Sequence, residues 1–172
     1  MALFVLSVAG SDRPGLTRTL AAAVLAAGGN WLESHLSRLG GLYVGSVLVE
    51  LAAEGVEPLR AAVAAVDAEG LEVRIAPAFA EAGETGEALA LDLVGRDRPG
   101  IVSQVTAALS ALGANIEAFD TRLSVEPHSG APLFHLAARV RLPAGVTATA
   151  AQAALEALSG EIMVDLSVGG AG

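Results

Sequence analysis

A four-residue word occurs twice in this sequence, and both copies have the composition of an anion-binding turn. Asp-Arg-Pro-Gly stands at 12–15 and again at 97–100, an offset of 85, and each copy separates a strand-like segment from a helix-like one. The backbone N–H groups at the start of a helix carry partial positive charge, which attracts a carboxylate or a phosphate. The sequence therefore predicts an anion-binding loop in each half of the chain.

An asparagine follows each copy of the word at the same offset. Asn30 and Asn115 are expected to begin the next strand, beside the far end of the helix, and an asparagine side chain both donates and accepts hydrogen bonds. A small zwitterion such as an amino acid suits this pairing. Its carboxylate would bind the helix N–H groups, and its ammonium would bind the asparagine or backbone carbonyls.

A purely structural interpretation of the same residues stands beside this one. Proline and glycine suit the dihedral angles of a turn, and aspartate suits the entry to a helix. An asparagine that follows glycine is also a common turn residue, because it tolerates the left-handed conformation. The spacing alone does not choose between a turn and a ligand site.

The remaining polar residues do not form a pattern typical of catalysis or metal binding. Zinc needs three or four convergent ligands, and the nearby candidates are only His128, His135 and Glu126, so these histidines and His35 are expected to be solvated. No base is evident for the serines Ser11, Ser34 and Ser103. The chain has no lysine and therefore no phosphate-binding G-x-x-x-x-G-K loop. We expect no enzyme activity, no metal and no cofactor.

Composition narrows the class of protein further. Hydrophobic residues make up 53% of the 172 residues and charged residues 17%, which is typical of a globular chain with a buried core. The 10 basic residues are all arginine and face 19 acidic ones, so the net charge of −9 disfavours direct nucleic-acid binding. The absence of cysteine fits a cytoplasmic protein, and no apolar run reaches the roughly 18–20 residues of a membrane helix.

The repeat extends well beyond the four-residue word and divides the chain in two. Further matches at the offset of 85 are Gly10 with Gly95, Leu16 with Ile101, and Gly28 with Gly113. Alternating and helical periodicities predict the order βαββαβ in each half. Pro14 is expected to open the first helix as its first residue, and Gly28 and Gly29 to end it. The other elements expected in the first half are strands 2–9, 30–39, 42–52 and 71–76 and helix 56–68, with Gly40 and Gly41 as a hairpin turn.

The second half repeats this order with one insertion. The expected elements are strands 88–95, 115–125, 132–142 and 161–168 and helices 99–112 and 147–158, and residues 126–132 form a longer hairpin loop. Each half is expected to stack two helices on one face of a four-stranded antiparallel sheet, which is a ferredoxin-like α+β fold. The predicted domains are residues 1–77 and 88–170, joined by a small, acidic linker at 78–87.

The two halves resemble ACT domains. The resemblance rests on D-R-P-G-L/I after the first strand and on G-x-N-W/I ahead of the second, and it covers residues 2–77 and 88–168. Two such units and little else resemble the glycine cleavage system transcriptional repressor family, although similar words open the ACT domains of formyltetrahydrofolate deformylase. Carried over onto this sequence, the resemblance implies a ligand loop at Asp12, Arg13, Pro14, Gly15 and Leu16 with Asn30, and another at Asp97, Arg98, Pro99, Gly100 and Ile101 with Asn115.

One residue departs from the family pattern. Trp31 stands where the second half has the smaller Ile116. Its ring either narrows the first ligand pocket or packs against a domain edge, and the sequence leaves both interpretations open.

The resemblance implies an amino-acid-responsive regulator. We expect a small amino acid such as glycine or serine as ligand and a protein partner such as a transcription factor, through which the chain acts as a co-regulator or repressor of glycine cleavage type. A homodimer is expected, because ACT-like units commonly pair. The alternatives are a ligand-free interaction or scaffold module, which would use exposed strand edges, and a regulatory subunit of an enzyme.

Overall fold

The chain folds into two compact units, Met1–Ala82 (unit 1) and Gly83–Gly172 (unit 2). The structure is a computed structural model and describes residues 1–68, 70–79, 86–158 and 162–168. Among these residues, no helix is long and apolar enough to cross a membrane. The predicted linker at 78–87 includes residues 80–85, which lie outside the described residues, so the predicted domain boundaries stay a prediction.

Both units have the order βαββαβ. Unit 1 contains β1 (Ala2–Ser11), α1 (Leu16–Ala26), β2 (Asn30–Leu39), β3 (Leu42–Leu51), a short 3-10 helix η1 (Ala53–Gly55), α2 (Val56–Ala68) and β4 (Leu71–Pro77). Unit 2 contains β5 (Glu87–Arg96), α3 (Ile101–Ala111), β6 (Asn115–Val125), β7 (Pro132–Leu142), α4 (Ala148–Glu156) and β8 (Ile162–Val168). The strands and helices therefore fall close to the ranges expected from periodicity.

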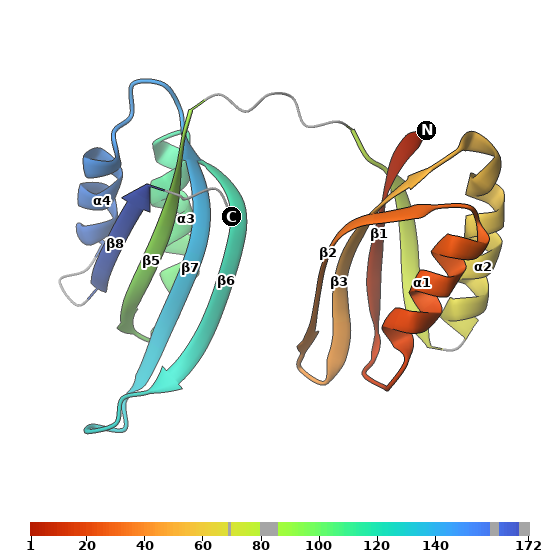
Figure 1. Cartoon of the computed structure of the whole chain (residues 1–172). Helices are drawn as coiled ribbons and strands as arrows, with labels where there is room; N and C mark the ends of the chain where they lie inside the picture. The colour runs from red at the N-terminus through yellow and green to blue at the C-terminus, as the bar shows by residue number, and fades with distance from the viewer. Residues whose placement is uncertain (69, 80–85, 159–161, 169–172) are drawn as a thin grey trace. The chain divides into compact units, whose positions relative to one another are not determined.

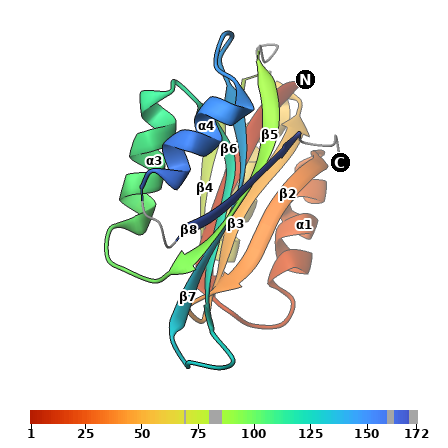
Figure 2. The ribbon, with the colours of Figure 1, turned by 90° about the vertical axis from the view of Figure 1, so that its left-hand side faces the viewer.

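Each unit has one four-stranded antiparallel sheet covered by helices on one face. The strand orders are β2-β3-β1-β4 and β6-β7-β5-β8, with every neighbouring pair antiparallel. Within each unit both helices lie on the same side of the sheet (Figures 1 and 2). The ferredoxin-like α+β fold expected from the sequence is confirmed.

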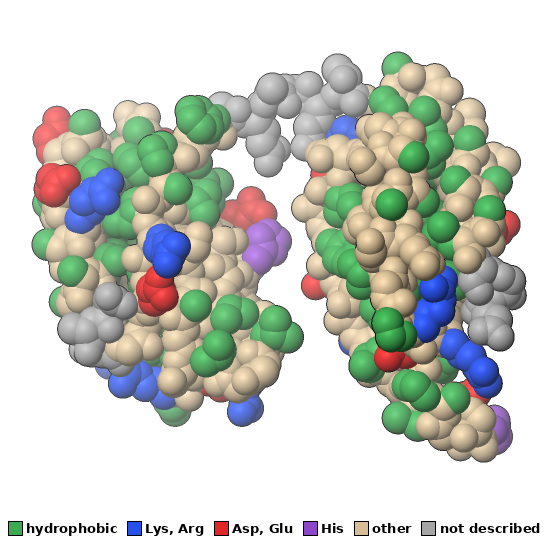
Figure 3. All heavy atoms as spheres, turned by 180° about the vertical axis from the view of Figure 1, so that it is seen from behind, with side chains coloured by type: hydrophobic (Ala, Val, Ile, Leu, Met, Phe, Trp, Pro, Cys, Tyr) green, Lys and Arg blue, Asp and Glu red, His purple; other side chains and the backbone are tan. Residues whose placement is uncertain are grey.

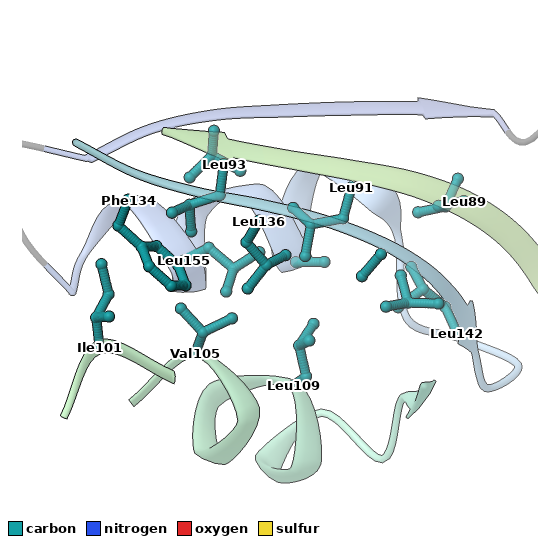
Figure 4. Close-up of a cluster of buried hydrophobic side chains, with 14 residues drawn as sticks. Leu89, Leu91, Leu93, Ile101, Val105, Leu109, Phe134, Leu136, Leu142 and Leu155 are labelled. Atoms are coloured by element: carbon teal, nitrogen blue, oxygen red, sulfur yellow. The ribbon is translucent and has the colours of Figure 1, made fainter. Parts of the chain in front are cut away.

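The core of unit 2 shows why these sequences form these elements. On β5, Leu89, Leu91 and Leu93 are fully buried, and they alternate with outward-facing residues because successive side chains of a strand point to opposite faces. On α3, buried residues recur every fourth position and point at the sheet (Figure 4). Those helix residues are Ile101, Val105 and Leu109. Leu16, Leu20 and Val24 repeat the pattern on α1 of unit 1.

The start of the first helix in each unit differs from the expectation. Pro14 and Pro99 are not the first helical residues, because α1 begins at Leu16 and α3 at Ile101. The residue before each helix is a glycine in the left-handed conformation, with φ of 97° at Gly15 and 87° at Gly100. A helical residue cannot adopt this φ, so the turn ends at the glycine and the proline lies within the turn.

The two central hairpins differ in their turns. Gly40 and Gly41 both have positive φ, as expected for the tight two-residue turn between β2 and β3. The loop between β6 and β7 is longer and is closed by its own hydrogen bonds, from the Glu126 N–H to the Ala131 carbonyl and from the Gly130 N–H to the Glu126 carbonyl, both 2.9 Å. This loop projects beyond the end of the sheet (Figures 1 and 2).

The burial pattern of α1 gives a direct test of the packing. Leu20 is fully buried, whereas Leu25 on the same helix is 75% exposed. Leu20→Ala should lower the free energy of unfolding by about 2–5 kcal/mol, because it leaves a cavity in the unit 1 core. Leu25→Ala should change it by less than about 0.5 kcal/mol. Urea denaturation of both variants measures the difference, and equal effects would contradict the assigned helix face.

Candidate functional site

The two predicted loops lie where the sequence placed them, between the first strand and the first helix of each unit. Asp12, Arg13, Pro14 and Gly15 are all exposed, and the following Leu16 is buried in the core. In unit 2, Arg98 is half-buried, whereas its neighbours Asp97, Pro99 and Gly100 are exposed and Ile101 is buried. One apolar residue therefore anchors each loop, and its polar part faces solvent.

The helices that follow these loops start without a side-chain cap. Neither α1 nor α3 has a side-chain hydrogen bond at its N-cap glycine. In contrast, α4 is capped by Thr147, whose Oγ1 accepts a hydrogen bond of 3.2 Å from the Ala150 N–H. The first N–H groups of a helix have no partner within the helix. At α3 the first of them, the Ile101 N–H, donates to the Arg98 carbonyl at 3.4 Å, so the groups that follow it are the ones that an outside acceptor could reach. An anion is the natural acceptor at this end of a helix.

In unit 1, the loop is tied to the neighbouring hairpin. The Asp12 carboxylate lies 3.2 Å from Arg38 Nε, and the Asp12 N–H donates to the Gly41 carbonyl at 3.4 Å. Thr17 Oγ1 and Tyr43 Oη are 2.6 Å apart, which links the first turn of α1 to β3. These contacts attach the β1–α1 loop to both strands of the hairpin.

In unit 2, the two side-chain contacts are replaced. The positions that match Arg38 and Tyr43 hold Leu123 and the buried Phe134, neither of which can form the ion pair or the hydrogen bond. Arg98 Nη2 instead donates to Gln104 Oε1 at 2.6 Å. The backbone contact is kept, because the Asp97 N–H donates at 3.1 Å to the carbonyl of Pro132, which stands at the position of Gly41. Within the described part of the chain the Asp97 carboxylate has no ion-pair partner. The two copies of the word therefore differ in how strongly their loops are fixed.

The structure does not bring the predicted asparagines to the loops of their own units. Asn30 pairs with Glu50 at one end of the β2–β3 hairpin, whereas the loop contacts Gly41 at the other end. At about 3.3 Å per strand residue, the length of β2 separates the two by about 30 Å. Asn115 likewise pairs with Arg141 at the end of β7 opposite to the Pro132 carbonyl that Asp97 contacts. A single amino acid cannot contact both groups within one unit.

A β-bulge follows each asparagine and was not expected from the sequence. The register shifts between Trp31 and Glu33 in β2 and between Ile116 and Ala118 in β6. In unit 2 the extra residue is Glu117, whose side chain is 11% exposed and lies 3.2 Å from Arg139 Nε and 2.5 Å from Arg141 Nε. A bulge re-aims one side chain, and here it directs a carboxylate onto two guanidinium groups.

Trp31 and two of the histidines contact other residues of their own units. Trp31 is half-buried and packs against the unit 1 core, in agreement with the packing interpretation. His35 Nε2 lies 3.0 Å from Glu33 Oε1, and His135 Nε2 lies 2.6 Å from Ser124 Oγ. Among the described residues, no group of three histidine or acidic side chains is arranged to hold a metal ion.

Comparisons with known proteins agree with this architecture. A family model of the ACT domain matches residues 2–75, which cover nearly all of unit 1. A crystal structure of an unknown protein from Galdieria sulphuraria is 31% identical, with a TM-score of 0.82 and coverage of 96% of both chains. The chain belongs to the ACT-domain family. Unit 2, with the same topology and the repeated loop, is the second ACT unit of this protein.

A second solved structure shares the fold over the full length of the ACT protein. It was crystallised as a proposed glycine cleavage system transcriptional repressor, and it has a TM-score of 0.70, 16% identity and coverage of 98% of both chains. No functionally curated protein matches the sequence. The fold of the chain, with its two βαββαβ units, thus occurs in at least two other solved structures.

The Glu117 cluster provides a test of the bulge. Glu117→Ala leaves two guanidinium groups without their carboxylate, one of them on the largely buried Arg141, and should lower the free energy of unfolding by about 1–3 kcal/mol. Glu72→Ala is the matched control, because Glu72 also pairs with an arginine but is exposed. It should cost less than about 1 kcal/mol. Chemical denaturation measures the free energy of unfolding of both variants. An equal loss in the two would show that the half-buried Glu117 cluster stabilises the fold no more than an exposed ion pair does.

Proposed function

We propose that this ACT protein is an amino-acid-binding regulator that acts through protein partners rather than by catalysis or direct DNA binding. ACT domains are regulatory modules, and two of them make up the described chain. The ligand is a small amino acid, with glycine and serine as the first candidates, and the regulated process is transcription of glycine cleavage type. The protein works in the cytoplasm as a homodimer.

The observation that supports this proposal is the uncapped start of the first helix in both units. Gly15 and Gly100 have no side chain that could accept a hydrogen bond from the helix N–H groups, as Thr147 does at α4. Without a side chain at this position, a ligand carboxylate can approach the backbone at the start of the helix closely. The same arrangement occurs twice in one chain.

Unit 2 is the better ligand site of the two. Among the described residues no arginine pairs with its Asp97 carboxylate, whereas Asp12 in unit 1 pairs with Arg38, so Asp97 is available to a ligand ammonium. Its loop also lacks the Thr17–Tyr43 hydrogen bond that links α1 to the hairpin in unit 1. A carboxylate on the α3 N–H groups and an ammonium on Asp97 together fit the zwitterion of an α-amino acid. Asn115 joins the site only through a second molecule.

Action through a protein partner follows from charge. With a net charge of −9 the chain is repelled by the phosphate backbone of nucleic acids. On the side of the molecule seen in Figure 3, arginine side chains are scattered among acidic and apolar ones and do not form a continuous basic surface. Regulation of transcription would therefore pass through a DNA-binding protein whose affinity for the ACT protein depends on the amino acid.

Thermal stability tests the ligand and its site. A ligand that binds only the folded state raises the free energy of unfolding with the logarithm of the ratio of ligand concentration to Kd. At a ligand concentration 100 times Kd, the increase is about 2.7 kcal/mol. The midpoint of thermal unfolding should rise by several degrees with glycine, serine or another standard amino acid. In Gly100→Asp the rise should disappear, because the new carboxylate occupies the start of α3.

The matched control separates loss of the site from loss of the fold. A Cβ at Gly100 meets no atom within 4 Å, so the fold should survive with a strain of about 1–3 kcal/mol. Gly145 has the same left-handed φ, 89°, and equal space, and it lies ahead of α4. Gly145→Asp should keep the ligand response. Unchanged binding in Gly100→Asp would exclude this site, and no response to any amino acid would favour the ligand-free scaffold.

A further inference from the structure

A hollow on the outer face of the unit 2 sheet, the face that points away from the helices, is lined by charged side chains of both signs. Its volume is about 330 Å³, and its lining includes Asp92, Asp120, Arg122 and His135. Asp92 and His135 alternate with buried residues of their strands, so they belong to the outer face. Strand pairing places Arg122 opposite His135, on the same face.

Strand pairing surrounds Ala137 with carboxylates. On β7, Ala137 pairs with Asp92 of β5 on one side and with Asp120 of β6 on the other, and Asp165 of β8 pairs with Asp92 in turn. The methyl group of Ala137 leaves the space between the first two carboxylates open. Neighbouring strands lie about 4.8 Å apart, so a group above Ala137 is within reach of both carboxylates. A cation is the group that this position favours.

The neighbouring row of the same face carries the opposite charge. Arg122 lies two residues beyond Asp120 on β6 and pairs with His135 of β7. The ring of His135 is fixed by Ser124, whose Oγ lies 2.6 Å from His135 Nε2. Two strand residues span about 7 Å, so Arg122 provides a binding position for an anion roughly that far from the position above Ala137.

The charges around the hollow are not paired with one another. Among the residues that the structure describes, Asp92, Asp120 and Arg122 form no ion pair and no side-chain hydrogen bond. Arg139, on the same face, is in contrast held by Glu117 at 3.2 Å. A few polar groups that converge on one cavity fix the orientation of a ligand. Here the cavity fits a ligand that carries both charges.

We propose that this hollow binds an ω-amino acid, a molecule with its ammonium and carboxylate groups at opposite ends of a short carbon chain. The ammonium group lies above Ala137 between Asp92 and Asp120, and the carboxylate pairs with Arg122. At bond lengths of about 1.5 Å, an extended chain of five or six carbons spans the roughly 7 Å between the two positions. Glycine is too short to reach both.

The first unit lacks the charges that this site needs. At the offset of 85, the positions of the two aspartates and the arginine are occupied by Ser7, His35 and Ser37. No carboxylate stands on either side of the central position in unit 1, and no arginine follows in the next row. The site is therefore a property of unit 2 alone.

This inference goes beyond the proposed function, because the site and its ligand differ from those of the loop. Gly100 precedes α3, which covers the opposite face of the sheet (Figure 4). Gly100→Asp should abolish the response to glycine or serine and leave the binding of an ω-amino acid unchanged. Failure of the loop site and failure of the outer-face site are thus distinguishable.

A titration of the full chain with 5-aminovalerate, followed by the backbone amide signals in NMR spectra, tests the site. The signals of residues 92–94, 120–122 and 135–137 should shift and saturate. In Asp120→Asn and in Arg122→Gln the Kd should rise by roughly tenfold or more, because each variant removes one charge-assisted contact to the ligand. Pentylamine and valerate carry only one of the two charges, so each should bind by roughly tenfold or more less tightly than 5-aminovalerate.

Arg60→Gln is the control, because Arg60 is an exposed arginine on α2 of the other unit, and its Kd should equal that of the native protein. The exchanged aspartate and arginine are exposed, and the remaining amide signals check that each variant folds. If Asp120→Asn does not fold, Asp92→Asn removes the facing carboxylate instead. Shifts that do not saturate, an equal Kd in the native protein and the site variants, or pentylamine that binds as tightly as 5-aminovalerate would overturn the proposal.

Discussion

The structure depends on burial of one face of each four-stranded sheet under two helices. Leucine and valine side chains on alternate strand positions fill the space between sheet and helices. The residues between them point to the opposite face of the sheet and take no part in the core. A layer of this kind buries only one side of a sheet, so the outer face faces water unless another protein surface covers it. The same alternation that makes the core thus also determines which side chains lie on the outer faces.

Sequence periodicity predicted this part of the molecule well, for a physical reason. Strand and helix ranges were correct to within a few residues, because alternation and helical spacing record which side chains meet the core. The helix starts were less accurate. Pro14 fits the first helical position on conformational grounds alone, and only the left-handed φ of Gly15 shows that the helix begins after it. Bulges such as that at Glu117 also leave no clear pattern, since they interrupt the alternation by a single residue.

The candidate site was predictable as a set of residues but not as an arrangement. The repeated word located both loops, whereas the distance between loop and asparagine depends on the length and direction of the strands between them. An ion pair such as that between Asp12 and Arg38 depends on the register of the hairpin and on the length and conformation of the side chains. Local sequence patterns do not encode these quantities. The two copies of the word within one chain can also be compared with each other. The same four residues contact different neighbours in unit 1 and unit 2, so the two units can differ in function.

The loop between β6 and β7 has a further consequence. Its ends are fixed by the pairing of Val125 with Pro132, and its internal hydrogen bonds close it independently of either core. The free energy needed to close such a loop grows only with the logarithm of its length, by roughly 0.6 kcal/mol for each doubling. The duplicated chain has therefore been able to change length here without disturbing the sheet, and a fluorescent reporter or an affinity tag inserted at this point would follow the protein in cells with little effect on its folding.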